Sequence, residues 1–249
     1  IGDLAGGDVG VGRLAEPERI ADAVAGVLPG GPLTGARVVI TAGGTREPID
    51  SVRYLGTRSS GKMGNAIAAA AARRGATVTL VTAGIGIEHP RVAVVPVETA
   101  AEMAEATWAA AADADIAVMA AAVADFRPTS PLEGKLRRSE GPPVIDLEPT
   151  TDVLGGIAAM DDRPFLVGFA AEVGGLDEAV EKARRKGVDL LVANDVAAPG
   201  SGFGTETNQV TIVLPDGGTE PWSLMSKSEV AERLWDRIAE LRKREGPAT

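Results

Sequence analysis

The stretch that decides the fold is Ile40-Thr41-Ala42-Gly43-Gly44-Thr45-Arg46-Glu47-Pro48-Ile49-Asp50, followed further on by Arg58-Ser59-Ser60-Gly61-Lys62-Met63-Gly64. The first run begins as a buried strand and breaks into a loop rich in glycine and hydroxyl groups. The second run leads into an alanine-rich helix. A helix start carries backbone N–H groups without intrahelical partners, and here we expect Ser59 or Ser60 to cap it while Lys62 adds a cation. This combination predicts an anion site, with phosphate as the obvious ligand.

Apolar runs alternate with helical segments through the rest of the chain. Strands are expected at 36–41, 76–82, 92–97, 116–122, 165–170, 190–193 and 209–214, and helices at 61–74, 100–112, 152–160, 176–186 and 227–244. This alternation predicts an α/β, Rossmann-like fold with a mostly parallel sheet and helices on both faces. Ligands of such sheets bind beyond the carboxyl ends of the strands. The candidate loops are 42–60, 124–143 (mostly a long polar loop), 171–175 and 194–208, in which 200–204 is expected to be flexible.

Composition excludes several classes of function. The net charge of −10 makes nucleic acid and acidic membranes unfavourable partners. The chain has no cysteine, which excludes disulfides and thiolate metal sites and fits a cytoplasmic location. The single histidine, His89, precedes a proline and cannot form a His-triad zinc site. No run of 18 apolar residues is present, so no membrane span is expected.

Residues with binding chemistry follow several predicted strands. Small residues at 120–122 allow a ligand ring to approach the backbone, and Asp125 offers a carboxylate to a base, a sugar or a metal. The cluster Lys135-Leu136-Arg137-Arg138 is basic on an acidic protein and is expected to close as a lid over a polyphosphate. Phe169 offers a ring for stacking, and Asn194 a carboxamide. Residues 56–63 nearly match a P-loop, but Met63 stands where a hydroxyl would hold magnesium.

These segments together resemble phosphopantothenoylcysteine synthetase, the ligase half of a bacterial bifunctional coenzyme A enzyme. The resemblance runs in order from about residue 35 to 244 and rests on 41–48, 52–54, 59–64, 121–126, 135–138, 168–172 and 193–196. It implies that the chain joins 4′-phosphopantothenate to L-cysteine, with CTP and Mg²⁺, through an acyl-cytidylate. It also implies a homodimer whose site is completed across the interface.

The resemblance implies roles for individual residues, with metal ligands left unassigned. Catalytic roles fall to Thr57, Lys135 and Asn194. Nucleotide contacts fall to Met119, Ala120, Ala121, Asp125, Lys135, Thr151, Asp152, Val153, Leu154, Phe169, Lys182 and Lys186. Phosphate and substrate contacts fall to Gly43, Ser59, Ser60, Gly61, Lys62, Met63 and Asn194.

Two departures from the family pattern matter. Thr57 stands where the family carries an asparagine implicated in the second half-reaction. Residues 1–35 resemble the end of the flavin-dependent decarboxylase half, but Gly6 replaces its catalytic cysteine. We therefore expect a leader and linker at 1–35, a nucleotide-dependent ligase domain at 36–249, no flavin and no decarboxylation.

Two other functions stay open at the level of sequence. A related nucleotide-activated ligase could use a different acid or amine, because Thr57 alters a catalytic position. The chain could instead be a non-catalytic Rossmann-type nucleotide-binding module, although no G-x-G-x-x-G follows the first strand.

Overall fold

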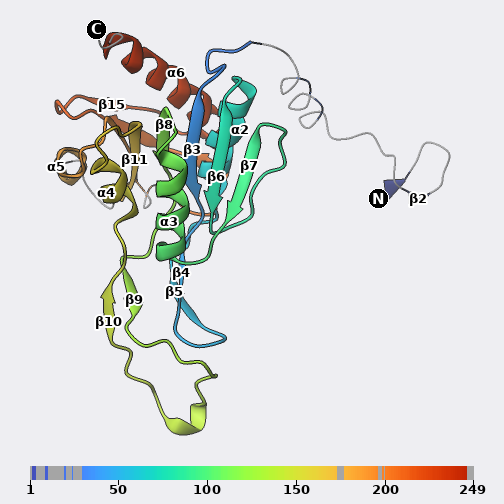
Figure 1. The fold of residues 1–249 in the computed structure, drawn as a ribbon, viewed down its shortest axis with the longest axis vertical. Helices are drawn as coiled ribbons and strands as arrows, with labels where there is room; N and C mark the ends of the chain where they lie inside the picture. Colours follow the sequence, from blue (N-terminus) through green and yellow to red (C-terminus); the bar gives the residue numbers. More distant parts are fainter. Residues whose placement is uncertain are drawn as a thin grey trace.

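A central sheet of eight strands organises the chain (Figure 1). This computed structural model describes residues 30–172, 177–195, 198 and 200–245, and also 2–3, 9–10, 20 and 24. The strand order is β15 (Thr219–Pro221), β14 (Val210–Val213), β12 (Leu190–Asp195), β11 (Phe165–Glu172), β8 (Ile116–Met119), β3 (Arg37–Ala42), β6 (Thr77–Thr82) and β7 (Val92–Pro96). The six strands from β12 to β7 are parallel, and β14 and β15 add an antiparallel edge. The predicted α/β, mostly parallel fold is confirmed.

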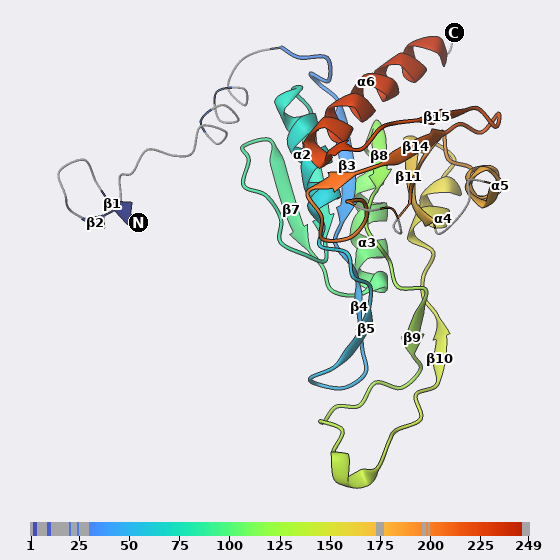
Figure 2. The ribbon, with the colours of Figure 1, turned by 180° about the vertical axis from the view of Figure 1, so that it is seen from behind.

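Helices cover both faces of this sheet. One face carries α2 (Lys62–Arg73) and α6 (Lys227–Glu245), seen from behind in Figure 2. The other carries α3 (Ala100–Ala111), α4 (Val153–Ala158) and α5 (Asp177–Lys186). Trp235 on α6 is fully buried, and its indole N–H donates to the Ile67 carbonyl of α2 at 3.0 Å. Aliphatic burial on both sides accounts for a fold with few aromatic residues.

Two arms project beyond the sheet on the side where the parallel strands end (Figures 1 and 2). One is the hairpin β4 (Arg46–Pro48) and β5 (Tyr54–Gly56), and the other pairs β9 (Phe126–Pro128) with β10 (Leu147–Pro149). The second arm includes a short 3₁₀ helix, η1 (Arg138–Glu140). The prediction of one polar loop from 125 to 143 was therefore wrong, because pairing with a segment about 20 residues away leaves no local pattern.

Asp50 joins the two arms. Its buried carboxylate accepts hydrogen bonds from the backbone N–H groups of Val52, Arg53 and Leu136 at 2.8, 2.7 and 3.0 Å, and also pairs with the Arg53 guanidinium. Burial alone raises the pKa of Asp50, but these hydrogen bonds lower it to about 2. The backbone of residue 134 also accepts from Ser51, so residues 134–136 lie fixed against the 50–53 turn.

Short strand pairs complete the fold. They are β1 (Gly2–Asp3) with β2 (Val9–Gly10), and β13 (Thr207–Asn208) with β16 (Met225–Ser226). Most of the predicted leader, including Gly6, lies outside the described residues, as do 173–175 of one candidate loop, so the boundary after residue 35 stays a prediction. Within the described part of the chain, no helix combines the length and apolarity needed to span a membrane.

Candidate functional site

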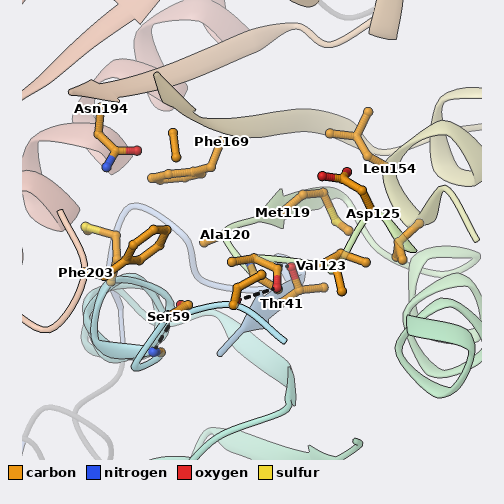
Figure 3. Close-up of a pocket in the computed structure, with 18 of the residues that line it drawn as sticks. Thr41, Ser59, Met119, Ala120, Val123, Asp125, Leu154, Phe169, Asn194 and Phe203 are labelled. Atoms are coloured by element: carbon orange, nitrogen blue, oxygen red, sulfur yellow. Dashed lines mark hydrogen bonds between the residues drawn. The ribbon is translucent and has the colours of Figure 1, made fainter. Parts of the chain in front are cut away.

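A cavity of about 540 Å³ lies at the carboxyl ends of the central strands. Its walls come from the start of α2, the ends of β8, β11 and β12, the start of α4, one face of α5, the loop 200–208 and the first residue of α6. Figure 3 shows Ser59 and Phe203 near one end and Asp125 and Leu154 near the other. This size and position match the ligand sites of open α/β sheets.

Nearly all the site residues expected from the sequence lie around this one cavity. The exceptions are Gly43 and Lys135. The residues that line it are Thr57, Ser59, Ser60, Gly61, Lys62, Met63, Met119, Ala120, Ala121, Asp125, Thr151, Asp152, Val153, Leu154, Phe169, Lys182, Lys186 and Asn194. Segments more than 130 residues apart in the sequence are thus brought together, but their individual roles stay predictions.

The start of α2 differs from the expected serine cap. The helix begins at Lys62, and its N-cap is Gly61, which has a left-handed φ of 79° and makes no side-chain cap hydrogen bond. Ser59 Oγ instead accepts the Gly61 N–H at 3.4 Å. The cap prediction was therefore wrong, because the left-handed turn at Gly61 moves the serines one step away from the helix. The first-turn amides consequently have no side-chain cap, as an anion site requires.

Glycines allow α2 to lie directly against β3. A Cβ on Gly64 would lie 2.6 Å from Ala42 Cβ and 2.9 Å from the Thr41 carbonyl oxygen. Gly43, with a φ of 81°, passes behind Gly61 and lies outside the cavity wall. Gly43 therefore packs closely against the turn that precedes α2, through its backbone.

One end of the cavity is built by α4 and α5. Asp152 is the N-cap of α4, and its Oδ1 accepts the Gly155 N–H at 2.9 Å. Its other oxygen pairs with Lys186 of α5. Burial raises the pKa of Asp152, but the hydrogen bonds from Lys186 and Gly155 lower it further, so it lies below the ordinary value. Lys182 lies one helical turn before Lys186 and also lines the cavity.

Two further lysines lie at the opposite end. Lys62 Nζ donates to the Gly204 carbonyl at 3.1 Å and pairs with the exposed Glu206 carboxylate. Lys227, the first residue of α6, is 7% exposed and donates to the carbonyls of Gly202 at 3.1 Å and Thr205 at 2.6 Å. The hydrogen bond from Lys62, together with its charge, holds the pKa of Glu206 below its ordinary value. The cavity therefore has a cationic group at each end.

The loop 200–208 is held by many hydrogen bonds, whereas the glycines of 200–204 led to the expectation of a flexible segment there. Asn208 is 3% exposed, and its Oδ1 accepts the Ser201 hydroxyl at 2.7 Å. Thr205 and Thr207 donate to carbonyls within the loop. These side-chain bonds and the two lysines replace the secondary structure that a glycine-rich sequence lacks.

The floor between the two ends is made of small residues and backbone. The Ala121 N–H donates to Thr41 Oγ1 at 3.1 Å, and the Thr57 hydroxyl donates to the Ala122 carbonyl at 3.1 Å. Phe169 and Asn194 extend from β11 and β12 above this floor (Figure 3). A ligand crossing the floor meets polar backbone and small side chains.

Lys135 lies away from this cavity. It is exposed on the second arm, between Gly134 and Leu136, which are both hydrogen-bonded to the 50–53 turn. In this conformation the basic cluster does not cover the cavity of its own chain, unlike the expected lid. The cause is the network around Asp50, which a sequence pattern does not show.

The residues present suit a metal carried by a nucleotide better than a metal cage. Among the described residues, no three His, Asp or Glu side chains gather closely enough to hold a metal ion. Asp125 supplies one exposed carboxylate at the cavity wall. Mg²⁺ in nucleotide sites commonly uses one or two carboxylates together with substrate phosphates. The donor set therefore fits Mg²⁺ that arrives with a triphosphate.

Comparison with known proteins agrees with this architecture. The model of the DNA/pantothenate metabolism flavoprotein C-terminal domain matches residues 33–241. The chain is 41% identical over 251 residues to the coenzyme A biosynthesis bifunctional protein CoaBC of Bacillus subtilis, covering 98% of this chain and 62% of that protein. It is 42% identical over 249 residues to a cysteine/cysteine sulfinic acid decarboxylase of an unknown prokaryotic organism, covering 96% of this chain and 69% of that protein.

A solved structure gives the same result. The crystal structure of the C-terminal domain of a CoaBC protein matches with a TM-score of 0.72 and 37% identity, covering 86% of this chain and 99% of that chain. The chain spans less than two thirds of the Bacillus protein, so the match concerns that part of it alone. Because the family model matches residues 33–241, which are most of the chain, this chain belongs to the DNA/pantothenate metabolism flavoprotein C-terminal domain family.

Proposed function

We propose that this chain is a phosphopantothenate–cysteine ligase that uses CTP and acts in coenzyme A biosynthesis. One observation carries the proposal: a single cavity has lysines at both ends of a floor of small residues. Two anionic substrates that must meet need cations at their outer ends and close approach at the centre. The residues that make this arrangement are those for which the family resemblance implies substrate contacts.

The nucleotide is assigned to the end formed by α4 and α5. There the triphosphate has Lys182 and Lys186 as its cations, Asp125 for the sugar or a magnesium ion, and Phe169 as a stacking surface for the base. The small side chains of Ala120 and Ala121 allow the base to reach backbone donors and acceptors. Mg²⁺ bound to the nucleotide would further neutralise the phosphates.

The phosphate of 4′-phosphopantothenate is assigned to the opposite end, at the uncapped start of α2. Its partners there are the first-turn amides and Lys62, with Asn194 at the neighbouring strand end. Binding requires Lys62 to exchange Glu206 for the substrate phosphate. Because both side chains of that pair are substantially exposed, the exchange costs little.

The reaction then proceeds in two transfers. The pantothenate carboxylate attacks the α-phosphorus of CTP, the bond to the β-phosphate breaks, and pyrophosphate leaves. The cysteine amine next attacks the acyl carbon of the cytidylate and loses a proton, and CMP leaves with the former carboxylate oxygen. No enzyme nucleophile takes part, which fits a chain without cysteine. Thr57 and Asn194 are assigned to orient the acyl-cytidylate for the second transfer.

A homodimer is part of this proposal. The arms expose large apolar side chains, namely Val52, Tyr54, Phe126, Leu132, Val144 and Leu147. Apolar groups gathered on projecting arms favour an interface between subunits. Lys135 does not line the cavity of its own subunit. In a dimer, the arm that carries it could bring Lys135 to the cavity of the second subunit. The cytoplasmic location expected from the sequence stays a prediction.

The test is a product assay on the purified chain with CTP, Mg²⁺, 4′-phosphopantothenate and L-cysteine. We expect phosphopantothenoylcysteine, pyrophosphate and CMP in equal amounts, and far slower turnover with ATP. Equal or faster turnover with ATP would contradict the choice of nucleotide. Turnover only with another acid or amine would favour a related ligase. Nucleotide binding without any turnover would favour a non-catalytic module.

A companion assay tests for the activity that is named in the relative called a cysteine/cysteine sulfinic acid decarboxylase. Cysteine or cysteine sulfinate is supplied alone, and carbon dioxide is measured. We expect none above the level without protein, because every assigned group serves binding, activation or aminolysis of a carboxylate. Sustained release of carbon dioxide would contradict the ligase assignment.

A further inference from the structure

Lys227 is a buried cation that the proposed reaction does not use. It is 7% exposed, lines the cavity and donates to two carbonyls of the 200–208 loop, those of Gly202 and Thr205. Its own backbone N–H donates to the Glu206 carbonyl at 3.0 Å. The first residue of α6 is therefore bonded to the loop by both its main chain and its side chain.

The position is unfavourable for a lysine. A cation at a helix N-terminus opposes the helix dipole, and burial removes its hydration. Burial, followed by the charge of nearby Lys62, lowers the pKa of Lys227, while Glu206 acts in the opposite sense. Groups held at such a cost are concentrated at functional sites.

The loop that Lys227 holds is a wall of the cavity. Gly202, Phe203 and Asn208 all line it, and Figure 3 shows Phe203 at the same end of the cavity as Ser59. Gly202 and Gly204 have φ values of 96° and 78°, so the loop relies on conformations that glycine permits. The loop therefore depends on hydrogen bonds to keep this shape, both those among its own residues and those from Lys227.

We propose that Lys227 is a positioning residue: its ammonium group fixes the 200–208 loop so that Phe203 and Asn208 form a preorganised wall for the phosphate-bearing acid. This rests on the proposed function for the identity of the acid. The α4–α5 end lies across the cavity, so the loop affects binding of the acid and leaves nucleotide binding unchanged.

The experiment compares Lys227→Met, which keeps the aliphatic stem, with Lys227→Arg, which keeps several donors. Lys243→Met is the matched control, because it removes an exposed lysine from the far end of the same helix. The rate of backbone hydrogen exchange in residues 200–208 measures directly how firmly this wall of the cavity is held. Calorimetric titration with 4′-phosphopantothenate and, separately, with CTP reports binding at the two ends.

We expect Lys227→Met to speed exchange in the loop about tenfold and weaken binding of the acid about tenfold. CTP affinity should change less than about twofold, and Lys227→Arg and Lys243→Met should stay close to the parent. Unchanged exchange in a folded Lys227→Met protein would overturn the proposal, as would equal weakening of both ligands. If that variant fails to fold, Phe203→Ala decides: selective loss of acid binding supports the wall, and unchanged binding overturns it.

Failure of the proposed function gives a different result. A parent protein that binds no 4′-phosphopantothenate would contradict the ligase assignment. In that case, hydrogen exchange in the 200–208 loop that is faster in Lys227→Met and close to the parent in Lys227→Arg would support the positioning role for a different anionic ligand.

Discussion

Replacing Gly64 with alanine tests whether the site depends on the close approach of α2 to β3. The new Cβ would lie 2.6 Å from Ala42 Cβ and 2.9 Å from the Thr41 carbonyl oxygen. Neither atom belongs to a flexible side chain, so the start of the helix must move. Crowding of this kind costs about 1–3 kcal/mol, and the higher helix propensity of alanine returns about 1 kcal/mol. We expect a net loss of up to about 2 kcal/mol in the free energy of unfolding.

The effect on function should exceed the effect on stability. The turn that must move contains Lys62 and Met63, which line the cavity. A displacement of such groups on the order of 1 Å can lower the rate about a hundredfold. Urea unfolding measures the first effect, and pyrophosphate release with limiting 4′-phosphopantothenate the second. Gly134→Ala is the control, because a Cβ there meets open space. A Gly64→Ala protein as stable and as active as the parent would refute the reasoning.

Four other predictions follow, three from substitutions in or near the site and one about the oligomeric state. In a single turnover, pyrophosphate release should outpace CMP release in the parent, with acyl-cytidylate accumulating, and Thr57→Asn should bring the two rates together; rapid quench showing equal rates in both proteins contradicts this. Lys135→Gln should weaken CTP binding or activation about ten- to a hundredfold, from a lost charge-assisted contact; unchanged pyrophosphate release removes Lys135 from the reaction. Asp152→Asn should lower stability at neutral pH by no more than about 1 kcal/mol, since the ion pair with Lys186 is partly exposed. Because the pKa of Asp152 is depressed in the folded protein, the Asp152 carboxylate contributes to the free energy of unfolding at pH values above its ordinary pKa of 3.8. This contribution is lost as the pH falls through the folded pKa, so the urea midpoints of the two proteins should converge in acid. Light scattering at micromolar concentration should give twice the chain mass of 25.4 kDa, and a mass near that of one chain contradicts the dimer.

The sequence predicted those features that local patterns encode. Apolar runs placed the central strands to within a few residues, and the alternation with helices predicted that most of them run parallel. Because parallel strands end at one edge, residues as distant as Ser59, Asp125 and Asn194 were expected on the same side, and all three line the cavity.

Features that depend on distant partners could not be predicted. The β9–β10 arm and its attachment to Asp50 come from pairing that neither segment shows alone. The 200–204 segment looked flexible because part of its order comes from Lys62 and Lys227, which belong to other elements. Lys227 carried one signal that sequence reasoning missed, a cation at a helix start where acidic residues are favoured.

The most direct test of the central claim follows the oxygen atoms of the substrate. 4′-Phosphopantothenate labelled with ¹⁸O in both carboxylate positions is turned over with CTP, Mg²⁺ and L-cysteine, and the CMP is analysed by mass spectrometry. Attack of the carboxylate on the α-phosphorus, followed by aminolysis, predicts one ¹⁸O atom in each CMP and none in pyrophosphate. CMP that forms with the amide product but carries no label would contradict an acyl-cytidylate in this cavity.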